Sequence, residues 1–132
     1  KYADEWNSVN VSPEVYAHKV QVLEQHCEAV GRDPATIRRS MMTFAVIGPD
    51  ERSLERATER MMGMWGAPAG TTPAQYRETL RGRGMIVGGK NEVVEACGKY
   101  AELGMGEIQF QHFNFDDDTV PEFLASEVAP AV

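Results

Sequence analysis

Residues 84–113 constrain the fold most, because they have the pattern of one complete β-α-β unit. A short apolar run leads into Gly88 and Gly89, apolar residues then recur at helical spacing as far as Gly104, and a second strand is predicted over 108–113. A crossover helix between two strands of one sheet makes the strands parallel and the connection right-handed. Ligands of such folds bind where strands end and helices begin.

The rest of the chain repeats this order of strand and helix. We predict strands over 3–7, 39–47, 85–87 and 108–113, helices over 13–30, 51–65, 90–103 and 120–128, and a short extra helix over 73–80. Four strand-helix units in 132 residues amount to half of a (β/α)8 barrel, which typically has about 250 residues. We therefore predict an α/β fold with parallel strands, one domain over 1–132 that forms half of such a barrel. A small open doubly wound sheet is the alternative.

The charge balance excludes some partners. The formal net charge is -7 and the pI is about 4.9, which argues against nucleic acid and anionic membranes. No apolar run approaches the roughly 20 residues that span a bilayer, and no signal peptide is visible. Cys27 and Cys97 fall on apolar helix stripes, as expected of reduced thiols in the cytoplasm. The chain begins without Met at Lys1, and we interpret it as a piece of a longer protein.

The ends of two predicted strands carry candidate binding residues. Gly88 and Gly89 lie at a strand-to-helix turn, where free backbone N–H groups favour anions; they either approach a phosphate or form a tight turn. Trp6 and Asn7 end the first predicted strand, and Trp6 is either a platform for a planar ring or a packed aromatic residue.

The last predicted strand contributes a second polar pair. Alternation places Gln109 and Gln111 on one face and Ile108, Phe110 and His112 on the other. In a barrel the two amides would point into the interior near its C-terminal mouth, where they would bind a substrate or form an internal polar layer. The sequence has no serine or cysteine triad, CxxC or HExxH motif, so we predict no catalytic residue and no metal site in this chain.

Several segments resemble one enzyme family. Residues 2–7, Tyr-Ala-Asp-Glu-Trp-Asn, resemble the YADxWN strand of the bacterial luciferase-like flavin or deazaflavin monooxygenases. Residues 84–93 resemble the GTPEEV turn of that family, although Gly89, Lys90 and Asn91 replace its Thr-Pro-Glu. Residues 100–108 are similar to its YAELGVDEI junction, and 123–130 are similar to its closing helix.

This resemblance implies a (β/α)8 barrel of which the chain is the second half, strands five to eight. It also implies FMN or coenzyme F-420 as the cofactor and a small organic substrate. The residues that carry over as cofactor-binding are Trp6 and Asn7, and then Gly88 and Gly89. The family's Gly-rich phosphate segment precedes the YADxWN strand and lies outside this chain, as do the first-half strands. We therefore expect the isolated chain to be inactive.

Two other functions remain open. A half-barrel leaves two sheet edges and an apolar face uncovered, so a non-catalytic chain of this kind is expected to associate into a homodimer. Alternatively, its partner is the N-terminal half of the barrel, which this chain does not contain. A small α/β domain that binds phosphate through Gly88 and Gly89 is the third hypothesis.

Overall fold

The computed structural model describes residues 2–113, 115–116 and 118–132. Its strands are β1 (Glu5–Val9), β2 (Arg38–Ile47), β3 (Ile86–Gly88) and β4 (Glu107–Gln111). Its α-helices are α1 (Pro13–Ala29), α2 (Glu51–Trp65), α3 (Pro73–Gly82), α4 (Lys90–Glu102) and α5 (Thr119–Phe123). A π-helical turn (Leu124–Val128) and a short 3-10 turn (Ala129–Ala131) continue α5, and another 3-10 turn (Pro34–Thr36) precedes β2.

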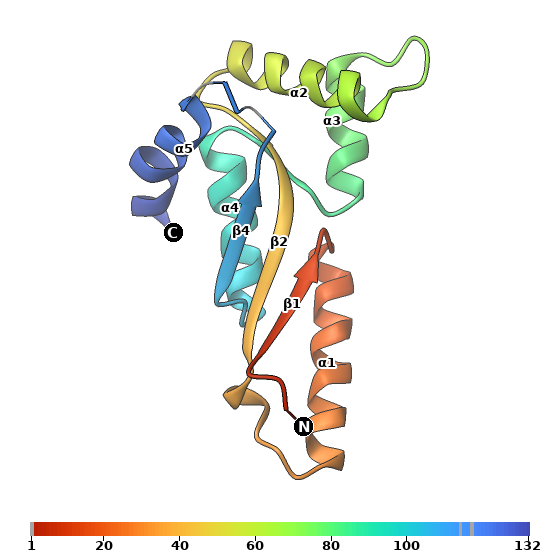
Figure 1. The fold of residues 1–132 in the computed structure, drawn as a ribbon, viewed down its shortest axis with the longest axis vertical. Coiled ribbons are helices and arrows are strands. Elements are labelled where there is room, and N and C mark those ends of the chain that lie inside the picture. Colours follow the sequence, from red (N-terminus) through yellow and green to blue (C-terminus); the bar gives the residue numbers. More distant parts are fainter. Residues whose placement is uncertain (1, 114, 117) are drawn as a thin grey trace.

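All described strands are parallel, and β2 is the strand to which the others pair. Its first half pairs with β1, its middle with β4 and its last three residues with β3. β1 and β4 lie on opposite sides of β2 (Figure 1). The predicted α/β fold with parallel strands, half of a (β/α)8 barrel, is confirmed.

The predicted pairing of the two strands that flank α4 is wrong. β3 and β4 both pair with β2 and not with each other. The reason is that the segment before β3 packs against the segment after β1. Gly84 lies so close to Val11 that a Cβ atom on Gly84 would be 2.6 Å from the Val11 backbone. β3 therefore continues the line of β1 and leaves the other edge of β2 to β4. The continuous wall of the half-barrel is β1-β2-β4.

The first strand begins and ends two residues later than the sequence predicts. Ser8 and Val9, predicted to be loop, pair with Met41 and Met42 of β2. The turn comes at Asn10, which has a φ of 45° and whose Oδ1 accepts a 2.8 Å hydrogen bond from the backbone N–H of Phe44. Trp6 and Asn7 consequently lie inside the strand, because backbone pairing with β2 continues past them.

Two helices, α2 and α3, begin at capping residues. Asp50 precedes α2, and its Oδ1 accepts a 2.7 Å hydrogen bond from the N–H of Ser53. Thr72 and Gln75 form a capping box at the start of α3. Because both caps are local in sequence, the predicted start of each helix agrees with the structure.

Two apolar clusters lie on different sides of the sheet. The larger packs α1, α4 and α5 against β2 around Tyr16, Met41 and Val93. The smaller packs α2 and α3 against the last residues of β2 and β3, with Val46 and Leu80 at its centre. The wall is therefore covered by helices on one face along its whole length, and on the other face at the C-terminal end of β2.

Candidate functional site

The uncovered face of the wall is organised in rows across the three strands. Parallel partners share a face, so the register aligns Asn7, Ser40 and Glu107 in one row. The next row toward the C-terminal end holds Val9, Met42 and Gln109. The last row holds Phe44 and Gln111. Such rows are the layers that fill the interior of a (β/α)8 barrel, so this face is the inner face of the half-barrel.

The first row is held by a polar network. The amide of Asn7 donates to the Ser40 hydroxyl at 2.8 Å, and that hydroxyl donates to Glu5 at 2.5 Å. Arg38 also pairs with Glu5. The hydrogen bond from Ser40, followed by Arg38, lowers the pKa of the Glu5 carboxyl. This network lies toward the N-terminal ends of the strands, the end at which barrels place stabilising residues.

Trp6 faces the opposite way from Asn7. Its ring stacks on Tyr16 of α1, with centroids 5.4 Å apart and planes 3° apart. The structure thus separates the two residues that the sequence groups as cofactor-binding. The arrangement of Trp6 is that of a packed aromatic side chain, and its role toward a cofactor stays a prediction.

Gln109 and Gln111 both lie on the inner face, as the alternation predicts. Both side chains are exposed there, whereas Ile108 and Phe110 face the helices and are half-buried. The amide of Gln109 donates to Glu107 at 2.8 Å. The two glutamines approach the C-terminal ends of the strands, where a barrel binds its ligand.

An aromatic cluster beside Gln111 was not predicted from the sequence. Phe44 packs edge-on against Trp65, with centroids 4.8 Å apart, and Phe113 lies 5.4 Å from Phe44. Trp65 remains 39% exposed. The residues come from β2, the end of α2 and the segment after β4, so no local pattern brings them together. The one sequence feature that points to this cluster is the alternation of side chains along β2, which places Phe44 on the same face as Ser40 and Met42.

The comparisons with solved structures agree with this geometry. The chain is similar to an F420-dependent secondary alcohol dehydrogenase in complex with an F420-acetone adduct, with a TM-score of 0.70 and 15% identity over 99% of this chain and 43% of that one. It is also similar to a long-chain alkane monooxygenase, with a TM-score of 0.59 and 13% identity over 98% of this chain and 36% of that one.

The chain shares its fold with part of these two enzymes. It spans less than half the length of either. No protein-family model matches the sequence, and no curated protein matches it. At these identities the likeness concerns the fold alone.

The glycine turn of this half-barrel already contains a carboxylate. The backbone N–H of Gly89 donates to Glu92 at 3.1 Å, across the start of α4. A Cβ atom on Gly88 would lie 2.6 Å from the Cβ of Glu92, so Gly88 lets the helix approach the strand. A phosphate at this turn would have to displace Glu92. Phosphate binding by Gly88 and Gly89 stays a prediction.

Other features of the half-barrel concern metals, thiols and membranes. Within 2–113, 115–116 and 118–132, no three histidine, cysteine or acidic residues gather to hold a metal ion. Cys27 is buried, Cys97 is half-buried, and both are free thiols. Burial raises the pKa of the Cys97 thiol. Among the described helices, none has the length and apolar character to cross a membrane.

Proposed function

We propose that this chain forms part of the barrel of a luciferase-like oxidoreductase that uses FMN or coenzyme F-420 and acts on a small organic substrate. The observation that carries the proposal is the fold match over 99% of the chain to an F420-dependent dehydrogenase. The sequence resemblance of residues 2–7 and 100–108 to the luciferase-like family supports it independently.

The inner face supplies groups suited to such a ligand. Gln109 and Gln111 offer amide donors and acceptors, which suit the polar edge of a flavin or deazaflavin ring or of a substrate. Phe44 and Trp65 offer an aromatic surface beside them. The cofactor, when bound, would supply the electron transfer, while these side chains would orient the ring and the substrate and exclude water. Since the chain is less than half of the enzymes it resembles in fold, we expect it to have no turnover alone.

Cofactor titrations test this function. The 132-residue chain is titrated separately with FMN and with coenzyme F-420, and the fluorescence of each cofactor is followed. We expect weak, saturable binding of one cofactor, because one wall of the pocket is present. Gln111→Ala should weaken binding, while Gln21→Ala, on helix α1, should leave it unchanged. Failure of both cofactors to bind would contradict the proposed cofactor site, and turnover by the chain alone would contradict its inactivity.

A second function, self-association, is favoured by the sheet edges. In the described part of the chain, β1 and β4 each pair with β2 and with no strand on their other side. An open groove lies beside each edge. One is lined by Trp6 and Val22 together with polar side chains of α1 such as His18 and Lys19, and the other mainly by apolar residues, among them Ile108 and Phe110. We propose that a homodimer covers these grooves when no N-terminal half does so.

Native mass spectrometry tests the dimer. Val22→Glu places a charge in the groove beside β1 and should dissociate the dimer, whereas Val15→Glu, at a 47% exposed site of the same helix outside that groove, should not. A wild-type chain that stays monomeric at high concentration would rule the homodimer out.

A further inference from the structure

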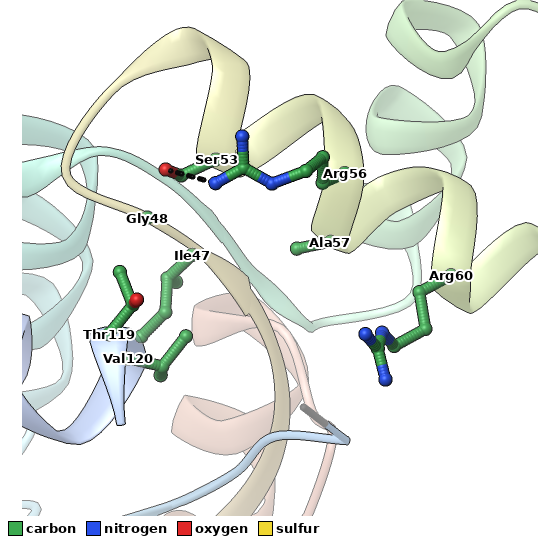
Figure 2. Close-up of a pocket in the computed structure, with 8 residues that line it drawn as sticks. All are labelled: Ile47, Gly48, Ser53, Arg56, Ala57, Arg60, Thr119 and Val120. Atoms are coloured by element: carbon green, nitrogen blue, oxygen red, sulfur yellow. Dashed lines mark hydrogen bonds between the residues drawn. The ribbon is translucent and has the colours of Figure 1, made fainter. Parts of the chain in front are cut away.

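A cavity of about 60 Å³ lies between α2 and α5, at the point where β2 ends. Figure 2 shows its wall, with the side chains of α2 on one side and those of β2 and α5 on the other. The lining residues include Gly48, Ser53, Arg56, Ala57, Arg60 and Thr119. A single water needs about 10 to 15 Å³ of such space. The cavity is therefore large enough for a small polyatomic ion.

The cavity lies near the C-terminal ends of β2 and β4, the end of the strands at which barrels of this kind bind their ligands. Here β2 and β4 are neighbours in the wall, Gly48 follows β2, and Thr119 begins the helix after β4. A Cβ atom on Gly48 would lie 3.0 Å from the backbone N of Leu54, so a side chain here would crowd the first turn of α2.

The cationic groups come from a stripe of arginines on α2. Arg52, Arg56 and Arg60 recur every four residues, and the last two line the cavity. Like charges at this spacing repel each other on a helix. Glu55 and Glu59 precede Arg56 and Arg60 on the same helix and offset part of this charge, and an anion in the cavity would offset it further. The two guanidinium groups lie at different ends of the cavity, with Ala57 between them (Figure 2).

The present partners of both arginines leave room for an anion. Arg56 donates to the neutral hydroxyl of Ser53 at 3.0 Å. Arg60 pairs with Asp116 at 3.3 Å, but the Asp116 side chain is 85% exposed and water competes for it. Asp50 is a further nearby carboxylate, held at the helix cap by the N–H of Ser53. Each guanidinium has five N–H donors in a fork that fits a phosphate edge.

A smaller cavity adjoins the first and contains an unsatisfied polar atom. Its volume is about 20 Å³, and Arg60 and Ala57 line both cavities. His112 lines the smaller one, and its Nδ1 is buried without a hydrogen-bond partner among the described residues. Buried polar atoms are generally paired, so this nitrogen indicates a site for an ordered water beside the larger cavity.

We propose that the larger cavity binds a tetrahedral oxyanion of the phosphate type, either free phosphate or the terminal group of a phosphate monoester. Arg56 and the Ser53 hydroxyl form its principal contacts, and Arg60 binds from the other end. The site differs from the Gly88-Gly89 turn. It does not depend on the proposed oxidoreductase function, since it requires no redox cofactor.

Calorimetric titrations of the 132-residue chain test the site, with inorganic phosphate and phenyl phosphate as probes and sodium chloride at equal ionic strength as the blank. We expect saturable binding of phosphate. Arg56→Gln should weaken it by about tenfold or more, because a charge-assisted hydrogen bond is lost. Arg60→Gln should weaken it less. Arg52→Gln is the matched control, since it removes the same charge from the same helix outside the cavity.

Each outcome decides the proposal. Phosphate binding that is reduced by Arg56→Gln and by the cavity-filling Ala57→Leu, but kept by Arg52→Gln, supports the site. If phenyl phosphate then binds as well, the ligand is a monoester; if phosphate alone binds, it is the free ion. No saturable binding, or equal losses in Arg56→Gln and Arg52→Gln, overturns the proposal.

Discussion

Trp6 and Tyr16 stack with their ring planes 3° apart, and this contact joins the first strand to the first helix. It places the Trp6 ring in the layer between β1 and α1, away from the inner face that carries Asn7. The most conspicuous aromatic residue of the N-terminal motif therefore contributes packing in this structure.

Replacing Trp6 should consequently cost stability. We expect Trp6→Ala to lower the free energy of unfolding by about 2 to 3 kcal/mol, since a half-buried aromatic ring and its stacking partner lose contact. Urea denaturation measures the change. Trp65→Ala, at a more exposed aromatic residue, should cost clearly less. Equal losses at the two positions would contradict the assignment of Trp6 to the core.

The hydroxyl of Tyr100 ties α4 to the segment after β1. It donates to the carbonyl of Val11 at 2.5 Å, and burial, followed by the charge of Glu14, raises the pKa of Tyr100 to about 12. Tyr100→Phe should lower the free energy of unfolding by about 1 to 2 kcal/mol, the usual cost of a lost buried hydrogen bond.

The same residue predicts a loss of stability in alkali. Because the folded-state pKa of Tyr100 is raised above the ordinary tyrosine value of 10.0, its contribution is complete below about pH 10 and is lost as the pH rises toward about 12. Denaturation midpoints measured across this range should fall more steeply in the wild type than in Tyr100→Phe. Parallel curves would show that Tyr100 ionises as freely in the folded chain as in the unfolded one.

The network around Glu5 predicts the opposite dependence in acid. The pKa of Glu5 is lowered from 4.5, so its contribution to stability is complete above about pH 4.5 and is lost as the pH falls below that value. Ser40→Ala removes the hydroxyl that contributes most to this shift. Its destabilisation relative to the wild type should therefore shrink in acid, as thermal melting at neutral and acidic pH would reveal. A constant difference would contradict the network.

Alanine substitutions at Gly88 and Gly98, one just before α4 and one within it, should change the free energy of unfolding in opposite directions. Gly88 has a φ of 150° and no space for a Cβ, so Gly88→Ala should destabilise the chain by about 1 to 3 kcal/mol. Gly98 lies within α4 with nothing within 4 Å of its Cβ position, so Gly98→Ala should stabilise the chain by about 0.5 to 1 kcal/mol. Chemical denaturation of both variants measures these changes. A neutral Gly88→Ala would mean that the turn relaxes.

The sequence predicts features that are set by near neighbours. The predicted bounds of α2 agree with the structure because Asp50 caps its start and Gly66, with a φ of 79°, follows its end. The faces of Gln109 and Gln111 are correct because side chains alternate along any strand. Phosphate binding at Gly88 rests on a local pattern that also suits a turn, and the pattern could not reveal that Glu92 occupies the space.

Features that depend on distant pairing could not be predicted. Nothing near β3 in the sequence shows that Gly84 packs against Val11 and moves this strand into line with β1. The cluster of Phe44, Trp65 and Phe113 likewise depends on three separate elements meeting at one end of the wall. The larger cavity of α2 and α5 depends in the same way on the meeting of Arg56 with Thr119.

The pairing of β1, β3 and β4 with β2 also bears on how the chain acquires its structure. Within the described residues, none of these three strands finds another strand until β2 is in place, so sheet formation has to proceed outward from it. β4 docks across the longest stretch of intervening chain, and closing that loop carries the largest entropic cost. The edge of the sheet that β4 forms should therefore be the last to pair and the first to separate from β2.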